Sequence, residues 1–459
     1  MQNVLRKNVY RHYSELILNR IVAICLYFLI AVIPLIINPF ALDYWYKPKI
    51  DSIYALLIIL GVIWGLQLLI SKKSVSIKIN VLLVPLSFYG LVSVLSTWYS
   101  VNTEISIYGD IFREEGICTI LSYIALTLIF SIMVESEQQL LTLLRGLLIS
   151  ATIISIYAII QYLGYNPTEH FIPLFRGVEN RAGSTIGNPT FLGKFLVLML
   201  PLAIGCFLQA EQQKEKRRLL ACILILFSAL MVTFTRASLV GFACSLGLLA
   251  VLLKGTVLLP GKKQLRIIVV CILCIIILVE LQAVIRNKGM TGNSSPSITK
   301  KVQSLFKGEL QARLYLWGKA ITVIKEKPLL GYGLDNQGIA LDRFSLEYAR
   351  KFRHAGILDR AHNNYLDIAI AQGIMGLAAY LWVILTFLIW LYKTTKAEQN
   401  AKQKIIYCAL LAAFCGYFIN DCFNFSVVSV SPTFWSLMGL TLSMKRLSGL
   451  AYSAETRYL

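Results

Sequence analysis

One histidine and three arginines have the chemical types and sequence surroundings that suit a general base and anion ligands. His362 stands in Arg360-Ala361-His362-Asn363-Asn364, directly before a long apolar run. Asn363 is placed to cap the helix that this run predicts, which sets His362 against the positive end of the helix dipole. That field disfavours the imidazolium form, and a general base requires a neutral imidazole. The alternative is an interfacial histidine that makes a single hydrogen bond. His354 lacks the helix start and ranks second.

Arg313 lies on a predicted amphipathic helix. The apolar residues Leu310, Leu314, Trp317, Ile321 and Ile324 recur at steps of three and four, and Pro328 ends the pattern. Arg313 projects beside this apolar stripe, where a charge needs a partner. The arginine either faces inward as an anion ligand, or reaches a headgroup or a loop carboxylate with its long side chain. Periodicity does not choose between these interpretations.

Arg236 and Arg181 lie in short connections. Residues 235–238 are the whole connection between two apolar runs, so Arg236 lies at or just within the membrane boundary. A cation within the hydrocarbon costs about 2.5–3.5 kcal/mol on insertion scales, less if it snorkels, and we expect a bound anion as its partner. Arg181 precedes residues 183–189, which predict a tight turn into a helix. The N–H groups of that turn suit an anion, although glycine there also serves the turn alone.

Membrane-spanning helices must position these residues. Of 459 residues, 57% are hydrophobic and 15% are charged, and the mean hydropathy is +0.67. In soluble domains about a quarter of residues are charged. The apolar runs are continuous, which indicates helices rather than barrel strands. We predict an all-α polytopic membrane protein with about twelve spans: 21–38, 53–70, 81–98, 117–134, 140–163, 190–209, 219–235, 237–253, 267–285, 363–392, 405–423 and 428–444.

The distribution of lysine and arginine predicts the orientation. Clusters such as Lys72-Lys73 and Lys216-Arg217-Arg218 fall in every second connection between the predicted spans. Because cytoplasmic loops carry the excess of cations, both termini are predicted to be cytoplasmic. The opposite connections are poorer in cations, and residues 99–116 hold four acidic side chains against Arg113 alone. The net charge of +20 thus follows from topology, and nucleic acid is not expected as a partner.

The connection between spans nine and ten is long and basic. Residues 286–361 hold fourteen Lys or Arg against six Asp or Glu. A connection of this length predicts secondary structure of its own, with a second helix near 338–352. The run that follows, to residue 392, corresponds to about 45 Å of helix, so its start is expected to protrude outward. We therefore divide the chain into residues 1–285, 286–362 and 363–459.

Several chemistries are disfavoured. All ten cysteines lie in or beside apolar segments. Cys271 and Cys274 have the spacing of a metal-binding pair, but no further metal ligands lie nearby in the sequence. There is no glycine-rich nucleotide loop that ends in Lys-Ser or Lys-Thr, and there is no aspartate-rich metal cluster. No metal, nucleotide or other cofactor is therefore expected.

The order of these motifs resembles the O-antigen ligase and O-antigen polymerase family of membrane glycosyltransferases. The matching segments are residues 235–238, 313–317 leading to 327–333, and 362–366 leading to Gly373 and Gly376, with 181–189 as a further segment. The resemblance covers about 181–440. It implies an inverting, metal-independent enzyme that transfers a glycan from a polyprenyl diphosphate carrier to an acceptor hydroxyl. His362 would be the general base, and Arg236, Arg313 and, less securely, Arg181 would bind the diphosphate.

The resemblance leaves the acceptor open. A glycolipid such as the lipid A core, a growing polysaccharide and a protein hydroxyl all remain, so ligation, chain polymerisation and protein O-glycosylation are alternatives. A transporter of lipid-linked glycans, which would carry charges deep within several spans, is a rival from another class. The expected location is the cytoplasmic membrane, with the active site on its outer face and membrane lipids as further partners.

Overall fold

The computed structural model describes residues 2–41, 43–70, 80–165, 181–254, 298–352 and 357–455. Within these ranges all regular structure is helical. The predicted span 267–285, the pair Cys271 and Cys274, and His354 lie outside the described residues.

The helices follow one another along the chain with short connections. The first are α1 (Gln2–Tyr27), continued by a π-helical turn (Phe28–Val32) and a 3-10 turn (Ile33–Leu35), α2 (Lys47–Ile70), α3 (Leu83–Trp98), α4 (Thr103–Tyr108), α5 (Ile117–Met133) and α6 (Glu137–Tyr162). A 3-10 turn (Ser184–Ile186) then leads to α7 (Pro189–Gln209), α8 (Gln213–Val232) and α9 (Arg236–Leu252). The rest are α11 (Ile298–Glu326), α12 (Gln337–Leu341), a 3-10 turn (Asp342–Phe344), α13 (Ser345–Phe352), α14 (Asn364–Ala397), α15 (Ala401–Asp421) and α16 (Ser431–Glu455).

Each predicted span except 267–285 coincides with a helix of the structure. Six described helices are long and apolar enough to cross a membrane: the segment Ser14–Leu35, α2, α6, α7, α14 and α15. Helices α3, α5 and α9 are shorter apolar helices. The chain is therefore an all-helical membrane protein, and the count of twelve spans stays a prediction.

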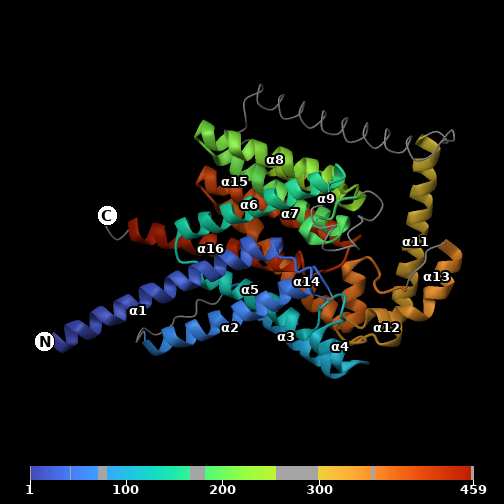
Figure 1. Cartoon of the computed structure of the whole chain (residues 1–459), viewed down its shortest axis with the longest axis horizontal. Coiled ribbons are helices and arrows are strands. Elements are labelled where there is room, and N and C mark those ends of the chain that lie inside the picture. Colours follow the sequence, from blue (N-terminus) through green and yellow to red (C-terminus); the bar gives the residue numbers. More distant parts are fainter. Residues whose placement is uncertain are drawn as a thin grey trace.

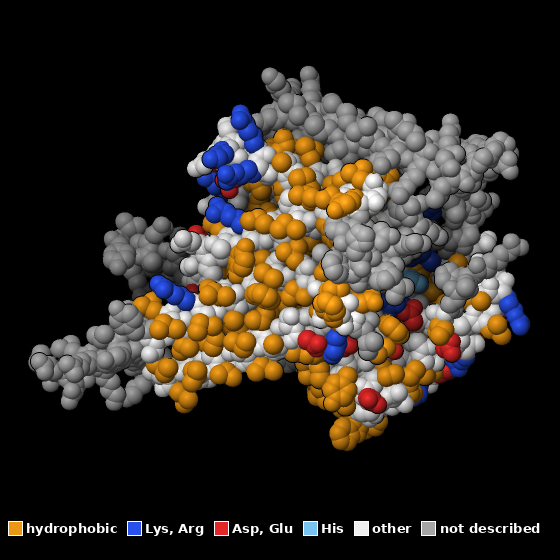
Figure 2. Space-filling view, in the orientation of Figure 1, with side chains coloured by type: hydrophobic (Ala, Val, Ile, Leu, Met, Phe, Trp, Pro, Cys, Tyr) orange, Lys and Arg blue, Asp and Glu red, His pale blue; other side chains and the backbone are white. Residues whose placement is uncertain are grey.

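The long helices form one bundle, and the large connection packs at one end of it (Figure 1). The start of α1 and the end of α16 lie together at one end, whereas α11, α12 and α13 lie at the opposite end. The first and last described helices therefore reach the end of the bundle that is away from the large connection. The bundle surface in Figure 2 is largely apolar. Which membrane face each end meets stays a prediction from the charge pattern.

Side-chain caps begin several of these helices. The caps are Asn102 for α4, Ser136 for α6, Asn188 for α7, Asn363 for α14 and Asn400 for α15, each accepting a hydrogen bond from a backbone N–H of the first turn. A cap satisfies N–H groups that have no partner within the helix. The predicted cap at Asn363 is confirmed, since its Oδ1 accepts from the N–H groups of Tyr365 and Leu366 at 3.1 and 3.2 Å.

Helix α14 is broken rather than continuous. Gly373 has a φ of +65°, and a side chain there would meet the Leu329 carbonyl oxygen at 2.1 Å. Backbone groups around the break bond to the segment 328–333, with Ile374 N–H donating to Pro328 O at 2.8 Å and Tyr332 N–H to Ile370 O at 2.9 Å. The prediction of one uninterrupted helix is therefore wrong, because the 328–333 segment replaces helical hydrogen bonds that the glycine breaks.

The large connection has a small core of its own. The predicted helix is present as α11, which ends at Glu326 before Pro328, and the second predicted helix is divided into α12, a 3-10 turn and α13. The residues of α11 that are buried are Leu316, Ala320 and Val323, which pack with Leu341, Tyr348, Leu358 and Ile370. The predicted stripe is divided: Leu310, Leu314 and Ile321 are exposed, whereas Ile324 packs against this core and Trp317 bonds to Ala361. Among the described residues, α11 therefore packs only part of its apolar surface.

Candidate active site

His362 lies at the start of α14 in a strained backbone conformation. Its φ is +51°, which is uncommon for any residue with a side chain. The side chain is exposed, and its ring lies 5.4 Å from the ring of Phe425 between centroids. Such strain persists only where the surroundings hold the backbone, so the contacts around His362 matter.

The neighbouring Ala361 is held by two elements. Its N–H donates to Asp367 Oδ1 of α14 at 2.7 Å. Its carbonyl oxygen accepts a hydrogen bond from the indole of Trp317, on α11, at 3.1 Å. Both backbone polar groups of Ala361 are therefore held by hydrogen bonds. Helices α11 and α14 together set the backbone conformation of His362.

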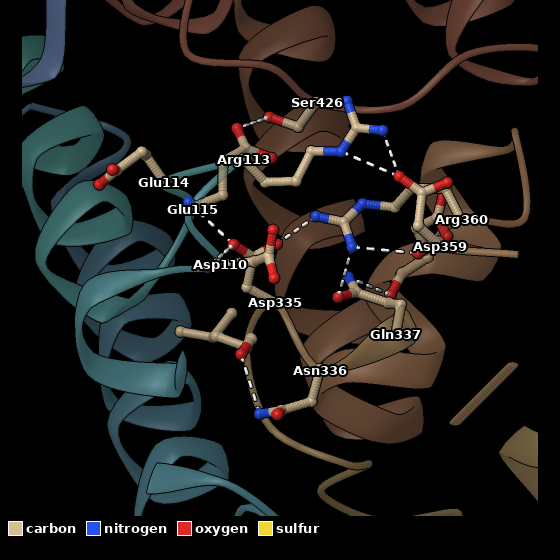
Figure 3. Close-up of polar contacts among 12 residues, drawn as sticks. Asp110, Arg113, Glu114, Glu115, Asp335, Asn336, Gln337, Asp359, Arg360 and Ser426 are labelled. Carbon is tan, nitrogen blue, oxygen red and sulfur yellow. Dashed lines mark hydrogen bonds and ion pairs between the residues drawn. The ribbon is translucent and has the colours of Figure 1, made fainter. Parts of the chain in front are cut away.

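A buried ion pair holds the chain just before this point (Figure 3). Arg360 pairs with Asp335, and both side chains are buried. Arg360 also donates to Gln337 Oε1 at 3.0 Å. The second oxygen of Asp335 accepts from the backbone N–H groups of Asp110 at 2.6 Å and Glu115 at 3.1 Å. One carboxylate thus connects the segment before α5, the segment before α12 and the segment before His362.

A second ion pair lies closer to the surface (Figure 3). Arg113 pairs with Asp359, and its guanidinium lies 5.0 Å from the centre of the Phe425 ring. Burial raises the pKa of Asp359, but the charges of Arg113, Arg360 and His362 outweigh it and leave that pKa below its ordinary value. The Asp359 carboxylate is therefore ionised at neutral pH and lies close enough to His362 for their charges to interact.

Glu115 is buried beneath the Phe425 region. It accepts hydrogen bonds from Ser426 Oγ at 2.6 Å and Tyr123 OH at 3.2 Å. Burial raises the pKa of this carboxyl to about 7, although the hydrogen bond from Ser426 and the charge of Arg360 act in the other direction. Glu115 also lines a small internal cavity of about 50 Å³, together with Asp335 and Asp367.

The segment 423–426, between α15 and α16, is contacted from several sides. Arg313 donates to the carbonyl of Phe423 at 2.9 Å, and Lys194 of α7 donates to the carbonyl of Phe425 at 3.0 Å. Lys194 also forms a buried ion pair with Asp421 at the end of α15. Arg313 and His362 therefore both contact this segment, one at Phe423 and the other at Phe425.

Arg181 and Arg236 lie together at a neighbouring connection. Arg181 donates to the Thr233 carbonyl at 2.8 Å and to Thr235 Oγ1 at 3.0 Å, and Arg236 is the exposed first residue of α9. Thr235 Oγ1 donates in turn to the carbonyl of Pro189 at 3.3 Å, at the start of α7. The same turn of α7 carries Phe191, whose ring lies 5.2 Å from that of Phe425. A series of contacts thus joins Arg181, Arg313 and His362, and Arg236 follows Thr235 of this series in the chain.

Comparison with known proteins gives similarities over part of the chain. Residues 221–381 match the family model described as O-antigen ligase. This part of the chain is therefore similar to O-antigen ligases. Similar proteins include two named "Putative polysaccharide ligase". The one from Rickettsia conorii is 30% identical over 138 residues, covering 29% of this chain and 32% of the relative. The one from Rickettsia typhi is 29% identical over 130 residues, covering 28% and 29%. The chain thus matches about a third of these relatives' length.

The residues that match the O-antigen ligase model include three of the four predicted site residues. Arg236, Arg313 and His362 fall within residues 221–381, and Arg181 precedes them.

The predicted anion-binding turn next to Arg181 is not available in the structure. Ser184 is buried and donates its N–H to Gln161 Oε1 at 2.8 Å, and Gly187 N–H donates to Gly183 O at 3.2 Å. The turn therefore packs within the bundle.

Sequence reasoning did not find the residues that hold the candidate site together. The partners Arg113 and Asp359 are far apart in the chain, as are Glu115 and Ser426. Residues 99–116 stand out in the sequence as an acidic connection, and their Arg113 pairs with Asp359, three residues before His362. The pairing itself had no sequence signal, because charged residues without periodicity do not indicate their partners.

Proposed function

We propose that this protein is a membrane glycosyltransferase that moves a glycan from a polyprenyl diphosphate carrier to an acceptor hydroxyl on the outer face of the cytoplasmic membrane. The observation that carries the proposal is the arrangement of His362 and Arg313 on the 423–426 segment, within the residues that match the O-antigen ligase model. Transfer of a glycan to a lipopolysaccharide or a related surface glycan is the activity that this family suggests.

His362 acts as the general base. Its exposed ring accepts the proton of the acceptor hydroxyl, and the acceptor oxygen forms a bond to the anomeric carbon of the donor. The bond between that carbon and the diphosphate oxygen breaks, and its electron pair leaves with the diphosphate. Attack opposite the leaving group inverts the anomeric centre. The Asp359 carboxylate favours this proton transfer, because it stabilises the imidazolium that forms.

The arginines neutralise the diphosphate as it leaves. Guanidinium groups bind phosphate oxygens in pairs, and fixed cations outside bulk water stabilise the charge that develops on the leaving group. This removes the need for a metal ion in the proposed reaction. Substituting Arg236 or Arg313 by alanine lowers kcat/KM for the donor by about 10²–10³-fold. The exposed Leu310 and Leu314 beside Arg313 offer an apolar surface to the polyprenyl chain.

The decisive experiment is a transfer assay with purified protein, a synthetic polyprenyl diphosphate glycan and an acceptor. We expect His362→Ala to lower transfer by about 10²–10⁴-fold, because it removes the general base. The matched control is His354→Ala, which changes a histidine eight residues earlier and should leave transfer unchanged. Full activity of His362→Ala in this assay would falsify the proposed role.

A panel of acceptors separates the forms of this reaction. Transfer to a lipid A core glycolipid indicates ligation, transfer to a second carrier-linked glycan indicates polymerisation, and transfer to a serine- or threonine-containing peptide indicates protein O-glycosylation. The same protein in sealed vesicles tests the transporter alternative. A labelled glycan that crosses the membrane and stays on its carrier, without any transfer, would contradict the proposed enzyme.

A further inference from the structure

A groove runs between α6 and α8 at the end of the bundle that is away from the candidate active site. It encloses about 710 Å³, within the range of about 300–1,000 Å³ that is usual for small-molecule sites. Both helices begin at this end. Helix α6 is 26 residues long, so its first residue lies about 39 Å from Tyr162, which packs near the Thr233–Thr235 connection.

Cations gather at the end of this groove where α6 and α8 begin. Arg145 of α6 and Lys214 and Arg218 of α8 line it, with Glu215 as the carboxylate among the lining residues at this end. Arg145 and Glu215 approach to 3.7 Å, but their side chains are 68% and 42% exposed. An ion pair this exposed contributes little to stability. The rim carries three cations against one carboxylate, so its net charge is positive. Figure 2 shows lysine and arginine side chains gathered where α8 begins, beside an apolar surface.

The other half of the groove is apolar. Ile149 and Ile153 line it from α6, and Ile225 lines it from α8, about two turns further along each helix than the cations. Thr152 is a polar residue that lines this half. Its hydroxyl donates a hydrogen bond to the carbonyl oxygen of Leu148, one turn earlier in α6, at 2.7 Å. This half therefore suits a hydrocarbon chain better than water.

We propose that this groove binds one anionic phospholipid. Arg145, Lys214 and Arg218 hold its phosphate, and an acyl chain lies along Ile149, Ile153 and Ile225. The charge of the rim selects an anionic headgroup over a zwitterionic one, and the apolar half distinguishes a lipid from a soluble phosphate. The charge pattern of the loops assigns this end to the cytoplasmic leaflet, where anionic lipids attract cationic side chains. The site is independent of the proposed transferase activity.

The experiment measures lipid binding to the purified full-length protein by native mass spectrometry and by thermal stability. Phosphatidylglycerol is expected to bind and to raise Tm, and phosphatidylcholine and inorganic phosphate are not. The triple variant Arg145→Gln, Lys214→Gln, Arg218→Gln should bind phosphatidylglycerol on the order of 100-fold more weakly. Its matched control is Lys402→Gln, a lysine at the same end that pairs with Glu211 at 2.6 Å outside this groove.

A second variant tests the apolar half without changing any charge. Ala221→Phe places a large side chain in the groove from the exposed face of α8, and should also weaken binding of phosphatidylglycerol. Its control is Val251→Phe, on an exposed position of α9. Unchanged Tm without added lipid shows that each variant is folded.

Three results would overturn the proposal. Equal binding of phosphatidylcholine would mean that the cations do not select the lipid. Equal competition by inorganic phosphate, with Ala221→Phe unaffected, would mean a surface anion site. Efficient chemical cross-linking between Cys222 in the groove and Cys271 or Cys274 would mean that the chain itself covers this face.

Discussion

At the scale of single residues, the chemistry of His362 depends on a buried ion pair that never meets the substrate in the proposed reaction. Arg360 and Asp335 lie next to each other in the interior, and Asp335 also accepts two backbone N–H groups from the segment before α5. Because both charges lose their hydration, a buried ion pair adds little to the free energy of unfolding. Removing one partner lowers that free energy strongly, because the other charge stays buried without a partner. We interpret the pair as a device that sets the position of Ala361 and His362.

Asp335→Asn should therefore destabilise the protein strongly. It leaves the buried charge of Arg360 without its partner, which costs about 3–5 kcal/mol. The measurement is Tm in detergent, with Asp342→Asn as the control because that carboxylate is exposed. The double variant Asp335→Asn, Arg360→Met removes the unpaired charge and keeps an amide oxygen for the two backbone N–H groups, so it should recover stability but not kcat. If the double variant recovers full kcat, the pair does not position His362.

Glu115 gives the protein a predictable pH dependence. Its pKa of about 7 in the folded state lies above the unfolded value, so the folded protein binds this proton more tightly. Its contribution to stability is present at low pH and is lost as the pH rises from about 4.5 to about 7. Glu115→Gln keeps an oxygen for Ser426 and removes the ionisation. The fall in Tm between about pH 5 and about pH 8 should be smaller in this variant, whereas an identical fall would show that Glu115 is not the titrating group.

At the scale of elements, the break in α14 joins the large connection to the bundle. The 328–333 segment bonds to the backbone on both sides of Gly373, so the position of α12 depends on the position of the break. The short motif around Gly331 and Gly333 and the distant Gly373 thus form one structural unit. Their order in the sequence is part of the family resemblance, and their backbone contacts explain why glycine is needed there.

Gly373→Ala tests this unit. A methyl group there would meet the Leu329 carbonyl oxygen at 2.1 Å, in a φ that side chains rarely adopt, and should cost about 2–5 kcal/mol. Gly318→Ala is the matched control, because nothing lies within 4 Å of its added methyl group in α11. The control should be neutral or stabilising by up to about 1 kcal/mol. Equal Tm values for the two variants would contradict the tight contact at Gly373.

At the scale of the whole molecule, the two ends of the bundle hold different candidate sites. The end with α11, α12 and α13 holds the candidate active site, and the other end holds the start of α1, the end of α16 and the cationic groove (Figure 1). The charge pattern predicts that the active-site end faces outward. A donor that is presented at the outer face could then reach His362 without crossing the membrane.

Reporter fusions test this orientation. Alkaline phosphatase, which is active only outside the cytoplasm, should be active when fused after residue 345 and inactive when fused after residue 398. Green fluorescent protein should show the reverse pattern, because the two positions lie on either side of α14. The opposite result at both positions would invert the topology and with it the proposed location of the active site.

The sequence by itself determined the helices, the Asn363 cap of α14 and the candidate general base. These depend on local patterns: apolar runs of sufficient length, an asparagine before a run, and a histidine next to that asparagine. Only the tertiary structure decided which face of α11 is buried, where α14 breaks and which charges pair. Arg113 meets Asp359 and Asp335 meets Arg360 because packing brings distant segments together. Such contacts have no periodicity in the sequence, and low-dielectric burial, which fixes their energies, exists only once the chain has folded.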